Sequence, residues 1–393
     1  MPAFLLSSLF ALVGGHMVNY IVILYLQERI GSDVLAGIGF ALSFGSSIIF
    51  GWLAGVAADR LPPARLIHLA HGLFLVCLSG LLWAEVGASD AQRVPATLIS
   101  AFFGGLGWSF FGPARMATLG QIAAPEKLQP MTILYNLQVM IGFGLAPLII
   151  GLVRSRGDWR EVIATAVTCY LISSLLLLGT RTRRRADHIE TKSVFAEIGE
   201  GFAAVGANRL LTQLMCAAVI GFAMTGPLQI LLPKLAREVL GLSEAQRGGF
   251  LGLMAIASIL GGLLALPLSA RVHHGRTIFI GLSLSGLVFA SMSHWRDPLA
   301  ASAALIGVGM VGGFVISLIV AGIQHQAPEA LRGRVMSMYS IVSQVIPAGS
   351  GVIAGIVLKA HGVVDGVFIE GVALVTLALL GALLMPTLRR QAQ

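Results

Sequence analysis

The chain has 393 residues, of which 56% are hydrophobic and only 11% are charged. A soluble domain carries roughly 25% charged residues, so this composition excludes an ordinary water-soluble enzyme. The net charge of +8 does not indicate nucleic-acid binding, because the charges are spread between apolar runs and make no basic face.

Twelve runs of at least 17 residues contain no Asp, Glu, Lys or Arg. A helix of ~20 apolar residues crosses the hydrocarbon core of a bilayer, because it satisfies its own backbone hydrogen bonds. The alternation typical of a membrane β-barrel is absent from the sequence. We therefore predict an all-α membrane protein with twelve transmembrane helices. The predicted spans are 2–27, 34–58, 66–84, 94–114, 131–153, 162–180, 210–233, 248–270, 277–293, 298–328, 335–358 and 371–388.

The charges of the loops predict the orientation. If the N-terminus is cytoplasmic, the cytoplasmic side holds 16 of the 26 basic residues and 7 of the 18 acidic residues. The outer loops then hold 10 basic and 11 acidic residues. The positive-inside rule therefore predicts a multi-pass protein of the inner (cytoplasmic) membrane with both termini in the cytoplasm.

Polar side chains share one face of the first predicted span. Asn19 and Tyr20 follow His16 at i+3 and i+4, which places all three on the same side of a helix. A polar face is costly in lipid, so we expect it to point into the protein. His16 either hydrogen-bonds within the packed interior or carries a proton, because the ordinary pKa of histidine is about 6.5.

The loop after the second predicted span carries a charged motif made of Gly55, Asp59, Arg60 and Arg65. It resembles the Gly-x-x-x-Asp-Arg-x-Gly-Arg loop of the major facilitator superfamily. The resemblance implies that Asp59 latches a cytoplasmic gate with basic partners, and that Gly55 permits close helix packing. Prolines at 62 and 63 replace a glycine and a basic residue of that pattern, so we expect an altered latch. The alternative is a solvated charge pair at the membrane boundary.

Two further segments, 111–126 and 328–337, resemble the branch of the superfamily that contains the enterobactin exporter and the macrolide efflux proteins. The resemblance implies that Arg115, Arg332 and Arg334 meet acids of opposing loops at the cytoplasmic gate. Alternatively, these arginines only follow the positive-inside rule. Drug/proton antiporters of the superfamily usually carry an acid in the first span and an arginine within the fourth. The spans predicted here contain neither.

The fifth predicted span contains Gly142, Pro147 and Gly151. This is similar to a Gly-Pro-rich signature of the superfamily's antiporters, which favours export over uptake. We expect these residues to allow close helix approach and a local bend. Pure packing is the alternative, and Ala146 stands where the signature has a glycine.

An internal repeat divides the chain. Ala-Pro-Glu occurs at 124–126 and again at 327–329, an offset of 203 residues, each time before a predicted span. Two six-helix halves, 1–180 and 209–393, are therefore predicted, with a cytoplasmic linker at 181–208. Phe195, Ile198 and Phe202 predict an amphipathic helix inside that linker.

By resemblance, a substrate cavity lies between the two halves. Its predicted lining is His16, Asn19, Tyr20, Trp108, Gln138 and Gln229. The candidate proton carriers are His16, Asp59 and Glu370, and the sequence leaves the coupling ion open. We expect no cofactor or metal site, because the three cysteines lie in apolar runs without metal-ligand spacing. No phosphate-binding loop for nucleotide hydrolysis is present.

The predicted function is a secondary transporter, not an enzyme, that exports an amphipathic organic compound such as a drug-like molecule or siderophore by alternating access. We expect it to work as a monomer in the bilayer, with a small-molecule substrate and no nucleic-acid partner. An importer or facilitator of a neutral solute is the first alternative. A membrane scaffold or sensor without transport is an alternative from another class.

Overall fold

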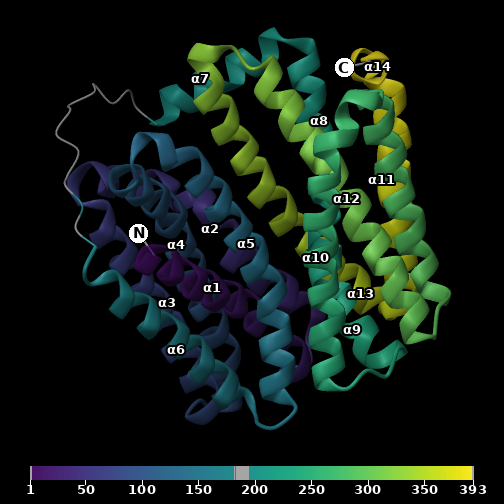
Figure 1. The fold of residues 1–393 in the computed structure, drawn as a ribbon. Coiled ribbons are helices and arrows are strands. Elements are labelled where there is room, and N and C mark those ends of the chain that lie inside the picture. Colours follow the sequence, from purple (N-terminus) through teal and green to yellow (C-terminus); the bar gives the residue numbers. More distant parts are fainter. Residues whose placement is uncertain (1, 181, 183–193, 392–393) are drawn as a thin grey trace. The chain divides into compact units, whose positions relative to one another are not determined.

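The computed structural model describes residues 2–180, 182 and 194–391, and every regular element among them is a helix (Figure 1). The first helices are α1 (Pro2–Glu28), α2 (Asp33–Arg60), α3 (Pro63–Val86), α4 (Asp90–Ile122), α5 (Pro125–Arg154) and α6 (Trp159–Leu177). They are followed by α7 (Val194–Ala207), α8 (Arg209–Ala223), α9 (Thr225–Lys234), α10 (Glu244–Leu268), α11 (His274–Ser291), α12 (Pro298–Gln326), α13 (Arg332–Leu384) and α14 (Pro386–Arg390).

Ten helical segments of the described residues are long and apolar enough to cross a membrane. The predicted span 34–58 lies on α2, which is not among these ten. The predicted spans 335–358 and 371–388 count as one of the ten, because both lie on α13, and the second reaches past α13 onto α14. The all-helical membrane fold is confirmed, and the count of twelve spans stays a prediction.

A glycine divides the long helix α13. Gly362 has φ 77° and ψ 176°, a conformation that residues with a Cβ rarely adopt. The hydrogen-bonding pattern runs through this point, but the backbone is not helical there. The two predicted spans on α13 therefore meet at a sharp break.

Polar side chains begin several helices. The Ser32 hydroxyl accepts from the backbone N–H of Leu35 at the start of α2. At the start of α6 the backbone N–H of Asp158 donates to Glu161 over 2.7 Å, within a capping box. Such caps satisfy N–H groups that the first turn leaves without partners, so the helix ends are encoded locally.

The chain forms two compact units. The first consists of Met1–Ile189 with Leu242–Gly252, and the second of Glu190–Gly241 with Leu253–Gln393. The first turns of α10 thus belong to the first unit, although they follow the linker in sequence. The division of α10 between the units is not part of the predicted halves.

The core of the first unit is built around α1, which contacts α2, α4, α5 and α6 (Figure 1). Every residue of α1 from 11 to 27 is buried. In the second unit α13 contacts α8, α9 and α11, and α12 packs on α8 and α11. The polar residues predicted on the first span therefore lie on a helix with almost no lipid-facing side.

Candidate functional site

His16 and Tyr20 on α1 lie among aromatic side chains of α4 and α5. The His16 ring is 5.2 Å from Trp108 and 5.3 Å from Phe143, measured between ring centroids. Tyr20 lies 6.0 Å from the same Phe143 ring. We call His16, Tyr20, Trp108 and Phe143 the aromatic cluster. The inward orientation predicted for the polar face of α1 matches these contacts.

Several polar atoms in and beside this cluster have no hydrogen-bond partner. Among the described residues these buried atoms include His16 Nε2, Asn19 Oδ1 and Trp108 Nε1. Leaving a buried polar group unpaired costs about 1–3 kcal/mol, so such groups are rare in native interiors. Together they present one donor, one acceptor and one imidazole nitrogen capable of either role. This set suits the hydroxyl, carbonyl or amine groups of an uncharged ligand.

The two glutamines predicted to line the cavity lie in different units. On α5, the Gln138 amide donates to the Leu5 carbonyl of α1 over 3.0 Å, and its Oε1 has no partner among the described residues. Gln229 is buried on α9 in the second unit. Gln138 therefore tethers α5 to the start of α1.

The predicted gate loop is described in part. Gly55, Asp59 and Arg60 lie on the last turns of α2, and their side chains fall outside what the structure describes. Arg65 is exposed on the first turn of α3. Pro63 is the first residue of α3, a position where its missing N–H and restricted φ favour a helix start. The departure from the family pattern thus serves to begin α3 directly after α2.

Arg115 is fully buried inside the first unit, where we expected a residue of a gate between loops. Its guanidinium donates to Ser8 Oγ over 2.6 Å, to Ser7 Oγ over 3.1 Å and to Ser173 Oγ over 3.0 Å. No acid is among its partners in the described residues. Because α4 continues to Ile122, Arg115 also lies within the fourth helix, which corrects the expectation that this helix contains no arginine.

His71 completes the surroundings of Arg115. Its Nε2 lies 3.2 Å from Arg115 Nη2 and accepts from it, because a guanidinium can only donate. Nδ1 then carries the proton and donates to Ser174 Oγ over 2.7 Å. The Phe4 and Phe111 rings lie 5.4 and 4.9 Å from the guanidinium carbon, at cation–π distance. Arg115 thus ties α4 to α1, α3 and α6.

The two arginines of the second predicted gate segment differ in environment. Arg332 is exposed, whereas Arg334 forms an ion pair with Glu200 of α7 in the second unit. Gly201, beside this pair, packs against Met338 of α13. The described partner of Arg334 is therefore an acid of the linker helix, where we expected an acid of an opposing loop.

Gly142 and Gly151 of α5 provide close helix approach on two sides. A Cβ on Gly142 would lie 3.0 Å from the Leu12 carbonyl carbon of α1. A Cβ on Gly151 would lie 3.0 Å from Gly248 Cα, in the first turns of α10. Because backbones approach this closely only without a side chain between them, these glycines serve the packing role predicted for them.

A cluster of charges at the end of the first unit was missed by the sequence analysis. Glu28 accepts from Arg247 over 2.7 Å and lies 3.7 Å from Arg154, which is also 3.7 Å from Glu244. Arg247 and Glu244 pair as well. We call Glu28, Arg154, Glu244 and Arg247 the ionic end cluster. Their side chains are 10–31% exposed, so most of this charge is removed from solvent.

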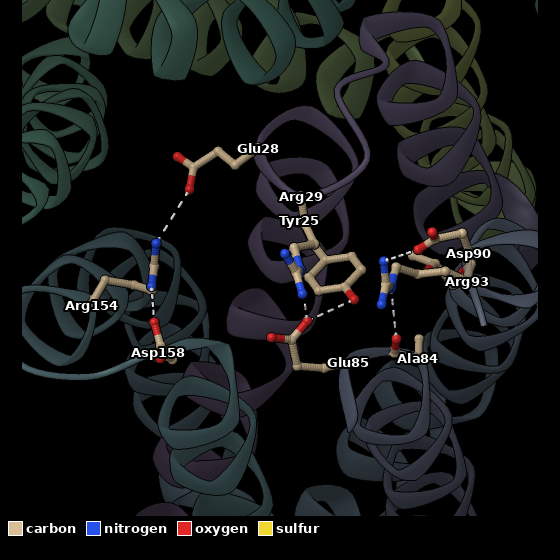
Figure 2. A network of polar contacts seen from close by, with 10 residues as sticks. Tyr25, Glu28, Arg29, Ala84, Glu85, Asp90, Arg93, Arg154 and Asp158 are labelled. Carbon is tan, nitrogen blue, oxygen red and sulfur yellow. Dashed lines mark hydrogen bonds and ion pairs between the residues drawn. The ribbon is translucent and has the colours of Figure 1, made fainter. Parts of the chain in front are cut away.

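Figure 2 shows one side of this region, where helix ends of the first unit meet. Arg154 lies between Glu28 and Asp158, at 3.4 Å from the latter. Its guanidinium carbon also lies 4.8 Å from the centroid of the Trp159 ring. Beside it, Tyr25 and Arg29 both donate to Glu85 at the end of α3. Each of these charges lies next to the end of a predicted span. This position is the signal in the sequence that could have indicated the cluster.

Comparison with known proteins agrees with this fold. Residues 4–352 match the family model of the Major Facilitator Superfamily. The chain is 25% identical to the enterobactin exporter EntS of Salmonella paratyphi A, over 100% of this chain and 94% of that protein. It is 21% identical to macrolide efflux protein A of Streptococcus pyogenes, over 58% of this chain and 56% of that protein.

Solved structures show the same fold. The D-xylose-proton symporter matches with a TM-score of 0.79 and 15% identity, over 99% of this chain and 97% of the symporter. The nucleoside transporter NupG matches with a TM-score of 0.79 and 13% identity, over 98% of each chain. Together with the family match and the apolar helices, this shows that the chain is a multi-pass membrane transporter of the Major Facilitator Superfamily and not an enzyme.

Proposed function

We propose that this transporter exports an amphipathic organic small molecule, such as a drug-like compound or a siderophore, by alternating access. The observation that carries the proposal is the aromatic cluster with its unpaired His16 and Trp108 nitrogens and the neighbouring Asn19 oxygen. Aromatic faces with a few neutral donors and acceptors suit a ligand that is largely apolar and carries few polar groups.

The absence of charge at the aromatic cluster argues against small, highly charged substrates. No ion pair of the described residues involves a member of the cluster. A carboxylate or phosphate substrate would need a positioned arginine or lysine to replace its hydration. Arg115, a fully buried cation of the first unit, is instead surrounded by Ser7, Ser8 and Ser173.

Export is supported by the relatives and by α5. The two relatives named above are called an exporter and an efflux protein. The Gly142, Pro147 and Gly151 face of α5 is similar to the signature of the superfamily's antiporters and packs on α1 and α10. We further propose that the protein resides in the inner membrane with both termini in the cytoplasm, as the loop charges predict.

Alternating access requires closures that form and break. We propose that Asp59, with Arg60 and Arg65, latches the cytoplasmic side, and that the ionic end cluster closes the opposite side. If protons drive export, His16, Asp59 and Glu370 are the candidate carriers. His16 belongs to the aromatic cluster, and Glu370 on α13 has a buried Oε1 without a partner among the described residues.

The second candidate is import or facilitated passage of a neutral solute. It is favoured by the uncharged donors and acceptors beside His16 and by the likeness of the fold to a D-xylose-proton symporter. Metabolite profiles of a deletion strain and its parent, inside and outside the cell, distinguish the two. Export predicts a compound that accumulates inside the mutant and decreases in its medium. A compound depleted inside the mutant and left in the medium indicates import.

Transport is then measured with the purified full-length protein in proteoliposomes, using the compound that the profiles identify. Counterflow that is lost on Trp108→Ala but retained on Trp295→Ala, a tryptophan outside the aromatic cluster, supports the proposed site. A wild-type protein that moves no candidate compound in either direction would contradict transport and favour a scaffold.

A further inference from the structure

A cavity of about 420 Å³ lies at one end of the second unit, between the first turn of α8 and the short helix α14. It is lined by Arg209, Leu210, Pro386, Thr387, Arg390 and Gln391. Each polar side chain of this lining can donate a hydrogen bond, and none is an acid. Neither Arg209 nor Arg390 has an ion pair within the described residues. Such a lining favours an anion.

The position of the two arginines is held by the packing of α14. Leu388 is completely buried, and its backbone N–H donates to the Gln213 side chain of α8 over 2.7 Å. On the other side, the Leu388 carbonyl packs against Gly275 of α11. A Cβ at position 275 would overlap this carbonyl oxygen, so only glycine permits the contact. Because α14 is fixed on both α8 and α11, Arg390 is held on the same side of the unit as Arg209.

The neighbouring surface identifies the kind of anion. Leu383 and Leu384, the last residues of α13, are 68% and 74% exposed, directly before the turn that leads to Pro386. Exposed leucines on a membrane-spanning helix are in contact with acyl chains. The cavity therefore lies where an apolar, lipid-facing surface changes to a basic one, on the side predicted to face the cytoplasm.

We propose that this cavity binds the headgroup of an anionic phospholipid, with its phosphate between Arg209 and Arg390 and its acyl chains along Leu383 and Leu384. Arginine forks match phosphate oxygens, and Thr387 adds a hydroxyl donor. The backbone N–H groups of Leu210 and Leu211 are already bonded to Asn208, so the side chains must supply the binding. The proposal is independent of the transported substrate.

The test is native mass spectrometry of the delipidated full-length protein titrated with phosphatidylglycerol or with phosphatidylcholine. We expect tighter binding of phosphatidylglycerol, and a roughly tenfold or larger loss of this preference in Arg209→Gln/Arg390→Gln, since each surface arginine contributes about 1 kcal/mol. Arg209→Lys/Arg390→Lys should keep the preference. Arg271→Gln, which removes an exposed arginine outside the cavity, is the matched control.

The outcomes separate the sources of the anion. Unchanged phosphatidylglycerol binding in the double Gln variant overturns the proposal, as does an equal loss in Arg271→Gln, which indicates diffuse attraction. Displacement of the lipid by millimolar inorganic phosphate shows a site for free phosphate and also overturns the lipid assignment. Thermal unfolding of each variant in detergent verifies folding, and the Lys variant keeps the test decisive if the Gln variant unfolds.

Discussion

Glu28, the last residue of α1, and Arg247, in the first turn of α10, form an ion pair of 2.7 Å although 219 residues separate them. Both side chains are largely shielded from solvent, with 14% and 10% of their surface exposed. Opposite charges attract each other more strongly in such surroundings than in water. Removing one partner is also more costly there, because the other charge is left buried and unpaired. The stability of the ionic end cluster therefore depends on all four of its charges.

Glu28→Gln should destabilise the first unit by about 2–4 kcal/mol, because Arg154 and Arg247 then share only Glu244 within the cluster. The measurement is thermal unfolding in detergent. Asp90→Asn is the control, since the Asp90–Arg93 pair has a 96% exposed carboxylate and should change stability by less than about 1 kcal/mol. Equal melting temperatures for the two variants would show that the cluster contributes nothing.

Gly248→Ala should destabilise the protein by about 1–3 kcal/mol, because a Cβ there overlaps the Pro147 carbonyl and lies 3.1 Å from Gly151 Cα. Gly249→Ala is the matched control on the same helix, since a Cβ at Gly249 meets no atom within 4 Å. Removing that glycine from a helix should stabilise the protein by up to about 1 kcal/mol. If both variants shift thermal unfolding in the same direction, α5 and α10 do not pack as described.

Arg115→Lys should also destabilise the protein, although it keeps the charge. A lysine ammonium has three donors on one nitrogen and cannot reach Ser7, Ser8, Ser173 and His71 in the way the planar guanidinium does. We expect a loss of about 2–4 kcal/mol, measured as the free energy of unfolding. Arg160→Gln, an exposed arginine on α6, should have no measurable effect. A Lys variant as stable as the wild type would refute a geometric role for the guanidinium.

Asp59→Asn should reduce turnover while folding and membrane insertion stay intact, if Asp59 latches the cytoplasmic gate. Loss of the carboxylate weakens the proposed pairing with basic residues, so single cysteines on the cytoplasmic side should react faster with a soluble maleimide. Transport and labelling rates are measured on the same preparations, with Asp90→Asn as the control. Normal transport at normal expression would remove Asp59 from the mechanism.

His16→Gln distinguishes proton coupling from ligand binding. Glutamine keeps hydrogen-bonding capacity but cannot take up a proton. If His16 carries protons, the variant should lose accumulation driven by a pH gradient but retain substrate binding and exchange. A binding role predicts an altered affinity with the same dependence on the gradient. We expect the second result, because the acid usual in the first span of related antiporters is missing. His273→Gln, an exposed histidine before α11, is the control.

Lost coupling with unchanged affinity in His16→Gln would show that our expectation is wrong. Proteoliposomes with the imposed gradient and counterflow without a gradient measure the two properties separately. The comparison uses one substrate concentration series for both assays.

The sequence determined the positions of most of the membrane-spanning helices. A bilayer core requires helices with internally bonded backbones, so charge-free runs such as 2–27 and 298–328 coincide with α1 and α12 within a few residues. The charged end of α4 was one exception. Arg115 ended the predicted run at 114, whereas the helix continues to Ile122, and the buried hydroxyls of Ser7, Ser8 and Ser173 accept hydrogen bonds from its guanidinium.

Tertiary structure alone decided which residues meet. Helices that are apolar on every side, such as α1, carry little periodicity to show which face turns toward which neighbour. The partners of Glu28, Arg115 and Gly151 are set by backbone approach between helices distant in sequence, where a missing Cβ or a bonded guanidinium selects one arrangement. Span positions follow from local composition, whereas helix contacts depend on the packing of the whole unit.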